Sequence, residues 1–205
     1  MRRQPIFART VFGARLLACV LVVAAVPFVG GCDGSPSEEE LQALFDQGEF
    51  LCRETRWKEA RVVLREFLLY RPNHAGAHFY LGRAYLFTRP VIAEGELQTA
   101  LELFIEGGRI STVERFGHDY FELICNIESA KACLLQIDPM LRRGAPPASA
   151  QSLLERAERY VRDADAVMPG TKEVGDLEEA IADYQTLRSR TFPRNRNPLN
   201  APTNV

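Results

Sequence analysis

The sequence contains few of the residues that build catalytic or metal centres. Its 205 residues include 3 histidines, 5 cysteines and 1 tryptophan. The patterns HExxH, GxSxG, GxxxxGK[ST] and CxxC do not occur, and no GxGxxG stands between a strand and a helix. We therefore expect no catalytic residues, no metal and no cofactor.

A surplus of positive charge is also missing from most of the chain. The only charged residues before Cys32 are Arg2, Arg3, Arg9 and Arg15. Four of the 25 basic residues thus lie in this segment, and 21 basic and 27 acidic residues follow it, a net charge of −6. Nucleic-acid-binding surfaces need clustered positive charge, so we expect no nucleic-acid partner.

The longest apolar run is too short for a permanent membrane-spanning helix. It covers Leu16 to Val29, 14 uncharged residues that follow the basic start MRRQPIFARTVFGAR. A basic start and a short apolar run are typical of a secretory signal peptide.

The end of this run, Val29-Gly30-Gly31-Cys32, resembles the signal of bacterial lipoproteins. The resemblance implies that residues 1–31 are removed, that Cys32 is acylated, and that residues 32–35 tether a domain to a bacterial cell membrane, facing the periplasm or exterior. Asp33 resembles a signal that retains lipoproteins in the inner membrane, although the sequence is compatible with anchoring in either the inner or the outer membrane. The alternative is an ordinary secretory signal with a chance cysteine.

Strand patterns are nearly absent beyond Cys32, and apolar residues recur with helical periodicity. We predict an all-α domain over 36–190 and a disordered, proline-rich and asparagine-rich tail over 191–205. Capping boxes are expected at Ser35–Glu38 and Ser111–Glu114, and a helix break at Asp138-Pro139. The expected helices cover 36–53, 57–70, 75–87, 93–106, 112–137, 148–167 and 172–190.

The chain also resembles itself at regular intervals. Gly48 and Gly82 lie 34 residues apart, each within the first helix of a predicted pair. The second helices share small and apolar residues at equal steps, and two of them end at a proline. These residues are Ala60, Leu64, Phe67 and Pro72, then Ala157, Val161, Ala164 and Pro169, with a partial copy at Ala100, Phe104 and Gly107. Small residues allow two helices to pack closely, and such pairs stack into solenoids.

The segment Leu81-Gly82-Arg83-Ala84-Tyr85 resembles the first-helix motif of tetratricopeptide repeats, and Trp57-Lys58-Glu59-Ala60 resembles the start of their second helix. The resemblance implies a short superhelix of about three helix pairs. The second pair has extra residues near Thr88–Glu94, the third (112–169) is irregular, and 172–190 forms a capping helix.

In this family the first helices line a groove that binds peptides. The resemblance implies a groove lined by Phe45, Glu49, Arg53, Phe79, Arg83 and Phe87, together with Gln42, Cys52, Gly76 and Leu86. The alternative is that the three phenylalanines pack against neighbouring helices. The Lys and Asn residues of the family's carboxylate clamp are missing, so binding of chaperone tails is not implied.

His74 and His78 have the i, i+4 spacing of two metal ligands on a helix. Pro72 ends the preceding helix, so we expect His74 in a turn, His78 on the next helix and no metal. The remaining cysteines, Cys52, Cys125 and Cys133, are expected to be buried.

The sequence thus predicts a non-catalytic, membrane-anchored lipoprotein that binds a protein or peptide partner in the cell envelope. The alternative is a periplasmic cysteine-dependent helper enzyme or redox protein that uses Cys52 or Cys125. A third possibility is an oligomeric coat subunit.

Overall fold

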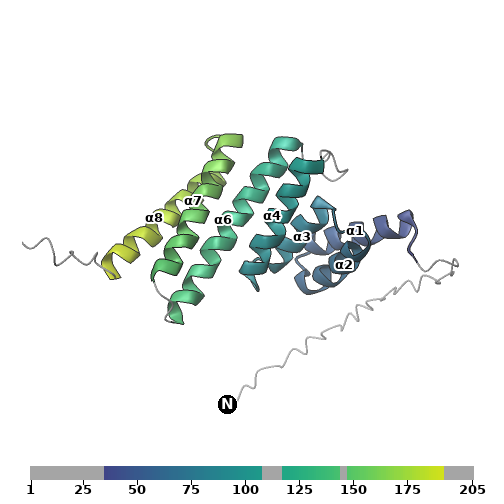
Figure 1. Ribbon diagram of the computed structural model, residues 1–205, viewed down its shortest axis with the longest axis horizontal. Helices are drawn as coiled ribbons and strands as arrows, with labels where there is room; N and C mark the ends of the chain where they lie inside the picture. Colours follow the sequence, from purple (N-terminus) through teal and green to yellow (C-terminus); the bar gives the residue numbers. More distant parts are fainter. Residues whose placement is uncertain (1–34, 108–116, 144–146, 192–205) are drawn as a thin grey trace, which may run out of the picture. The chain divides into compact units, whose positions relative to one another are not determined.

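The computed structural model describes residues 35–107, 117–143 and 147–191, and these residues form seven α-helices and no strand (Figure 1). The all-α prediction is confirmed. The helices are α1 (Glu38–Arg53), α2 (Trp57–Tyr70), α3 (Ala75–Tyr85), α4 (Pro90–Gly107), α6 (His118–Arg142), α7 (Pro147–Val167) and α8 (Lys172–Thr191). Within these ranges no helix has the length and apolar character needed to cross a membrane. The signal segment, Cys32, Ser111–Glu114 and the tail beyond Thr191 lie outside the described residues.

The first helix begins two residues later than the sequence predicts. Ser37, not Ser35, is its N-cap, and Glu40, not Glu38, closes the capping box. The Glu40 N–H donates to Ser37 Oγ (3.3 Å), and the Ser37 N–H donates to Glu40 Oε2 (2.8 Å). A serine followed three positions later by a glutamate occurs twice in this stretch, at Ser35 with Glu38 and at Ser37 with Glu40. The motif alone therefore does not determine at which serine the helix begins.

Glycine sets the close approach of the helices in the first two pairs, α1 with α2 and α3 with α4. A Cβ on Gly48 would lie 2.5 Å from Leu64 Cδ2, and a Cβ on Gly82 would lie 2.7 Å from Leu97 Cγ. Leu64 and Leu97 are fully buried. The two glycines, 34 residues apart, therefore make the same kind of contact in successive helix pairs.

Two helices extend beyond their predicted ends. α4 begins at Pro90 rather than residue 93, so of the extra residues near Thr88–Glu94 only Thr88 and Arg89 precede the helix. The predicted break at Asp138-Pro139 is wrong, because α6 continues through Pro139 to Arg142. Only one turn follows the proline, and Asp138 Oδ1 accepts a hydrogen bond from the Tyr184 hydroxyl of α8 (3.1 Å). Buried Ile137 and packing against α8 stabilise this end of the helix.

Helix α6 separates two hydrophobic cores. Phe121, Cys125 and Ala132 belong to the core formed with α1–α4, whereas Ile127 and Ile137 belong to the core formed with α7 and α8. A helix buried on two sides has no single polar face, and α6 accordingly shows no strong amphipathic pattern.

The small and apolar residues repeated within the second helices lie in these cores, whereas Pro72, Gly107 and Pro169 at the helix ends are exposed. Ala60, Leu64, Phe67, Ala100 and Phe104 are buried in the first core. Ala157, Val161 and Ala164 of α7 are buried in the second, against α6 and α8. α8 contributes Val174, Leu177 and Ile181, so it covers the apolar side of the last pair.

Candidate binding surface

Two of the three phenylalanines predicted to line a peptide groove are part of the core instead. The ring centroid of Phe79 lies 5.4 Å from that of Phe121 on α6, and Phe45 packs against Phe67, Tyr80 and the His74 ring. Both phenylalanines are buried. Phe45 and Phe79 therefore pack against neighbouring helices, which is the alternative that the sequence left open.

Glu49 is also buried, although it carries a charge. Its Oε1 accepts hydrogen bonds from the Tyr80 hydroxyl (2.9 Å) and from Arg53 Nη2 (2.5 Å). Burial, followed by the charge and hydrogen bond of Glu49, raises the pKa of Tyr80, so this hydroxyl stays a donor. Glu49 therefore joins α1 to α3 and is already occupied by its own chain.

The remaining groove residues differ in exposure. The Arg53 side chain is 62% exposed and Phe87 is 74% exposed, whereas Arg83 is half-buried with its guanidinium 5.8 Å from the Phe79 ring centroid. Among the other predicted positions, Gln42 is exposed, and Cys52, Gly76 and Leu86 are buried. Phe79 is covered by Phe121 of α6, and Phe45 is covered by Phe67 of α2 and by the His74 ring, so neither phenylalanine offers an open apolar surface.

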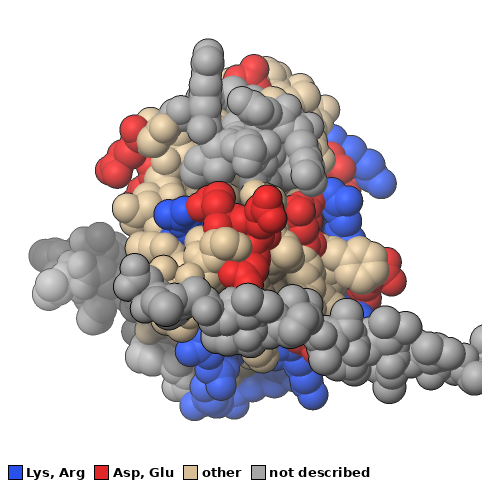
Figure 2. All heavy atoms as spheres, turned by 90° about the vertical axis from the view of Figure 1, so that its right-hand side faces the viewer, with Lys and Arg blue, Asp and Glu red and all other residues tan. Residues whose placement is uncertain are grey.

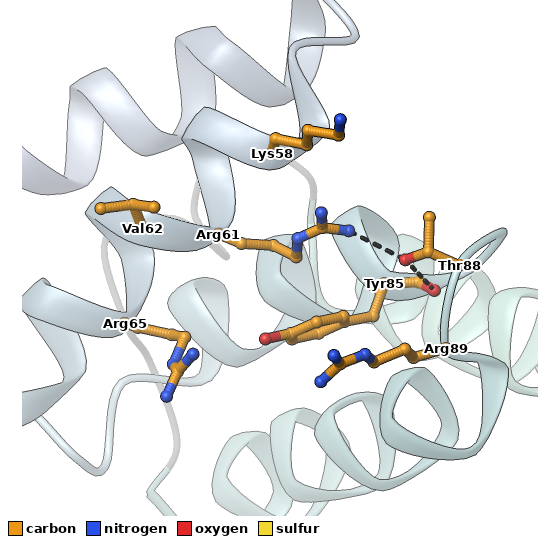
Figure 3. Close-up of a pocket in the computed structure, with 7 residues that line it drawn as sticks. All are labelled: Lys58, Arg61, Val62, Arg65, Tyr85, Thr88 and Arg89. Atoms are coloured by element: carbon orange, nitrogen blue, oxygen red, sulfur yellow. Dashed lines mark hydrogen bonds between the residues drawn. The ribbon is translucent and has the colours of Figure 1, made fainter.

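A pocket of about 400 Å³ lies elsewhere, between α2 and the turn from α3 to α4 (Figure 3). Four of its seven lining residues are basic and none is acidic. We call it the basic pocket, and its residues are Lys58, Arg61, Val62, Arg65, Tyr85, Thr88 and Arg89. Seen from the end of the domain with α1 and α2, Lys and Arg gather along the lower edge and acidic residues gather in the middle (Figure 2).

Arg61 is fixed at the centre of this pocket. Its Nη1 donates to the carbonyl oxygen of Ala84 (3.1 Å) and to Thr88 Oγ1 (2.8 Å), and its guanidinium lies 5.1 Å from the Tyr85 ring centroid. In Figure 3 the Tyr85 ring lies between Arg61 and Arg89. The end of α3 and Thr88 therefore hold the Arg61 guanidinium in a defined position in the pocket lining.

The solvent-facing side of α2 continues the basic pocket as a mixed stripe. Lys58, Val62, Arg65 and Leu69 follow each other at helical spacing, and all four are exposed. Val62 is 67% exposed and Leu69 is 79% exposed. This stripe therefore presents two cations and two large apolar side chains on one solvent face of α2.

The two neighbouring histidines hold the turn between α2 and α3. His74 is the N-cap of α3, and its Nδ1 accepts a hydrogen bond from the Ala77 N–H (3.1 Å). His78 bridges in two directions, with Nδ1 2.7 Å from Glu96 Oε2 and Nε2 2.7 Å from the Pro72 carbonyl oxygen. In the described part of the chain, no group of three or more His, Cys, Asp or Glu residues could hold a metal ion.

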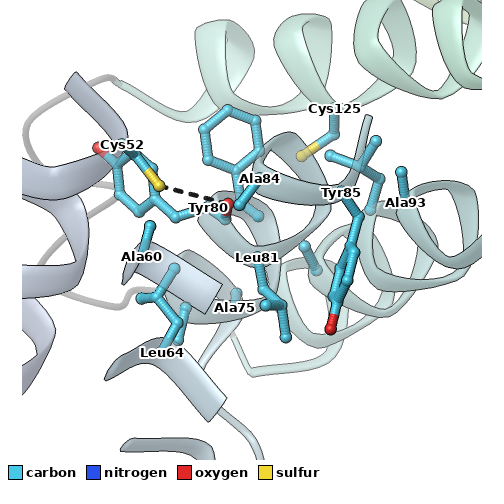
Figure 4. Close-up of a cluster of buried hydrophobic side chains, with 14 of the residues drawn as sticks. Cys52, Ala60, Leu64, Ala75, Tyr80, Leu81, Ala84, Tyr85, Ala93 and Cys125 are labelled. Carbon is cyan, nitrogen blue, oxygen red and sulfur yellow. Dashed lines mark hydrogen bonds between the residues drawn. The ribbon is translucent and has the colours of Figure 1, made fainter. Parts of the chain in front are cut away.

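The three described cysteines are buried, as the sequence predicts, and the structure shows that they are also free. Burial raises the pKa of Cys52 to about 12 and that of Cys133 to about 12, and it raises the pKa of Cys125 well above its usual range. The Cys52 thiol donates to the Tyr80 carbonyl oxygen (3.5 Å) (Figure 4). Thiols in this state are poor nucleophiles.

Glu94 of α4 is the centre of a polar cluster that the sequence interpretation missed. Its side chain is 12% exposed and forms an ion pair with Arg156 of α7, with 2.9 Å between Oε1 and Nε. It also accepts hydrogen bonds from Gln136 Nε2 (2.9 Å), the Cys133 thiol (3.2 Å) and the Tyr160 hydroxyl (3.5 Å). These groups join α4, α6 and α7 and satisfy the buried carboxylate.

The basic pocket was also missed, although one signal for it is present in the sequence. Placing 57–70 on a helical wheel puts Lys58, Val62, Arg65 and Leu69 on one side and the buried Ala60, Leu64 and Phe67 on another. The family resemblance directs attention to the first helix of each pair, whereas this surface is on a second helix. No protein-family model, curated protein or solved structure matches this chain.

Proposed function

We propose that the protein is a non-catalytic bacterial lipoprotein, anchored through Cys32, whose tetratricopeptide-type helical domain binds a protein partner in the cell envelope. The observation that carries the binding role is the exposed basic and apolar surface formed by the basic pocket and the adjoining face of α2. Scaffolding or assembly of an envelope complex is the activity that such a surface on an anchored domain serves.

Two features support the repeat assignment. The same glycine–leucine contact occurs in the α1–α2 pair and in the α3–α4 pair, at Gly48 with Leu64 and at Gly82 with Leu97. The first helix of one pair also packs against the first helix that follows that pair, as α1 does against α3 and α6 does against α8. This pattern is the packing expected of stacked helix pairs.

The anchor is supported by the order of the first 32 residues: a basic start, a short apolar run, two glycines and a cysteine. The tether to the helical domain is short, since α1 begins at Glu38. Several acyl chains on one cysteine provide stable attachment, whereas a single chain is marginal.

A cysteine-dependent enzyme or redox protein is the competing function, and the thiol environments argue against it. A nucleophilic cysteine needs a lowered pKa and access, whereas Cys52 and Cys125 are buried and their pKa values are raised. A thiol reagent applied to the native protein should leave all three unmodified. Rapid modification of Cys52 or Cys125 without unfolding would favour the enzyme.

The proposed function is tested by crosslinking intact membranes and purifying the wild-type chain and a Cys32→Ala variant. We expect a palmitate analogue to label the wild type but not the variant, and a reproducible partner protein to co-purify with the wild type. Labelling that persists in Cys32→Ala would contradict the anchor. Recovery of the wild-type chain alone, without a crosslinked protein, would contradict the binding role.

A further inference from the structure

Among the described residues, the cations of the basic pocket form no ion pair with a carboxylate, unlike neighbouring arginines. Three arginines in the same half of the domain form ion pairs, namely Arg53 with Glu49, Arg56 with Glu59 and Arg71 with Glu38. Within the described residues, no such pair involves Lys58, Arg65 or Arg89. Like charges brought together without counter-charges repel each other, so this pocket is complementary to an anionic group.

The pocket is also prepared for such a group. Arg61 is held by the Ala84 carbonyl oxygen and Thr88 Oγ1, so its guanidinium loses little freedom when a ligand binds. Arginine presents a planar set of donors that matches the two oxygens of a carboxylate. Arg65 and Arg89 approach the same space from α2 and from the residue before α4.

The size and rim of the pocket indicate more than a simple ion. A volume of about 400 Å³ far exceeds the roughly 30 Å³ that one water molecule occupies in the liquid. Exposed Val62 lines the pocket, and Leu69 continues its apolar edge along α2. A ligand that fills this space therefore carries both negative charge and apolar side chains. A recess between α2 and the turn from α3 to α4 fits inserted side chains better than it fits the flat surface of a lipid layer.

From these observations we infer that the basic pocket is the docking site for an acidic peptide segment of the partner protein. Carboxylates of the segment contact Arg61, Arg65 and Arg89, and an apolar side chain packs against Val62. This inference rests on the proposed protein-binding function and adds to it the place of binding and the chemistry of the partner.

The test uses the full chain, purified in detergent, to select binders from a displayed library of random short peptides. The selected peptides are synthesised, and their affinities are measured for the wild type and for a variant with Arg65→Glu and Arg89→Glu. The control variant carries Arg142→Glu and Arg162→Glu, two exposed arginines on α6 and α7 that give the same change in net charge. We expect acidic peptides with apolar residues, an affinity loss of at least about tenfold in the pocket variant, and less than about twofold in the control.

The pocket variant should remain folded. Arg89 precedes the first turn of α4, where a positive charge opposes the helix dipole, so Arg89→Glu is expected to leave the melting temperature unchanged or raise it. A tenfold loss of peptide affinity with an unchanged melting temperature would therefore reflect binding and not unfolding. If Arg89→Glu unfolds the protein, the affinities are measured with the single variant Arg65→Glu in its place.

Three results would overturn the inference. Selected peptides without acidic residues would show that the protein does not recognise acidic segments. Equal peptide affinities of the pocket and control variants would show that the peptides do not bind in the basic pocket. The third uses the Cys32→Ala chain and vesicles containing phosphatidylglycerol: flotation that depends on Arg65 and Arg89, without peptide binding, would assign the pocket to a membrane. In each case a partner that still crosslinks to the pocket variant in intact membranes would leave the proposed binding function standing.

Discussion

His74 and His78, four positions apart, have opposite electrostatic environments. Burial lowers the pKa of His74, whose unprotonated Nδ1 serves as the helix cap. Burial also acts to lower the pKa of His78, but the hydrogen bonds to Glu96 and to the Pro72 carbonyl oxygen, with the charge of Glu96, outweigh it and raise the pKa. Because a carbonyl only accepts, Nε2 is a donor, and Nδ1 donates to Glu96 when the ring is doubly protonated.

This difference predicts a pH-dependent contribution to stability from each histidine. The folded-state pKa of His78 lies above its ordinary value of 6.5, so its contribution is complete below that pH and is lost as the pH rises through the folded-state pKa. We expect His78→Asn to reduce the free energy of unfolding more at about pH 5.5 than at about pH 8.5. Chemical denaturation of both proteins at the two pH values measures this difference.

His74→Asn is the matched control, because asparagine is a good N-cap that does not titrate. The folded-state pKa of His74 lies below 6.5, so the stability it confers is present above that pH and is lost as the pH falls. The variant should therefore gain stability relative to the wild type at low pH. An equal and pH-independent effect of both substitutions would contradict the assignment.

The sequence predicts the place of these histidines but not their protonation. Pro72 and the repeat spacing put His74 in the turn and His78 on α3, and the structure agrees. Glu96 lies 18 positions after His78 and faces it only because α3 and α4 pack together. The opposite pKa directions therefore depend on tertiary contacts that no local pattern contains.

At the scale of helices, glycine positions test the close packing of α3 and α4. Gly82→Ala places a Cβ 2.7 Å from Leu97 Cγ and 3.2 Å from the Ala93 carbonyl oxygen, so we expect it to lower the free energy of unfolding by about 1–3 kcal/mol. Gly95→Ala in α4 is the matched control, since nothing lies within 4 Å of its Cβ position. Alanine there should stabilise the helix by about 0.5–1 kcal/mol. The melting temperatures of the two variants should move in opposite directions, and a shared direction would contradict the packing.

Glu94 makes a second prediction at this scale, because it connects α4, α6 and α7. Glu94→Ala leaves the Arg156 guanidinium without its carboxylate and removes one of the two acceptors of Gln136 Nε2, the other being the Ala132 carbonyl oxygen. We expect a loss of about 1–3 kcal/mol in the free energy of unfolding. Glu102→Ala, on an exposed position of the same helix, is the control and should change it little. Similar values for the two variants would show that the cluster does not stabilise the domain.

The helix pairs are visible in the sequence because their small and apolar residues recur at fixed steps. Ala60, Leu64 and Phe67 are buried as predicted. The ends of helices are harder to predict from the sequence. Pro139, for example, lies one turn before the end of α6 and does not end the helix, because contacts with α8 stabilise that turn. Glu94 was assigned to inserted residues, although it is the acceptor for side chains 39 to 66 positions away.

At the scale of the whole molecule, binding is expected on the second helix of a pair. The first helices contribute Phe45 and Phe79 to the core, where Phe79 packs against Phe121 of α6 and Phe45 packs against Phe67 of α2. The solvent face of α2 instead carries cations and apolar side chains beside the basic pocket. The sequence contains the α2 stripe, but the pocket depends on how α2 packs against the end of α3, and only the structure brings Arg61 to Tyr85 and Thr88.

We propose that the anchored helical domain binds its protein partner through the basic pocket. The most direct measurement places a photo-crosslinking amino acid in intact cells at Val62 in the pocket or, as a control, at exposed Glu178 on α8. We expect a discrete adduct from position 62, none from position 178, and loss of the adduct when Arg89→Glu is added. No adduct at position 62, or equal adducts at both positions, would contradict the claim.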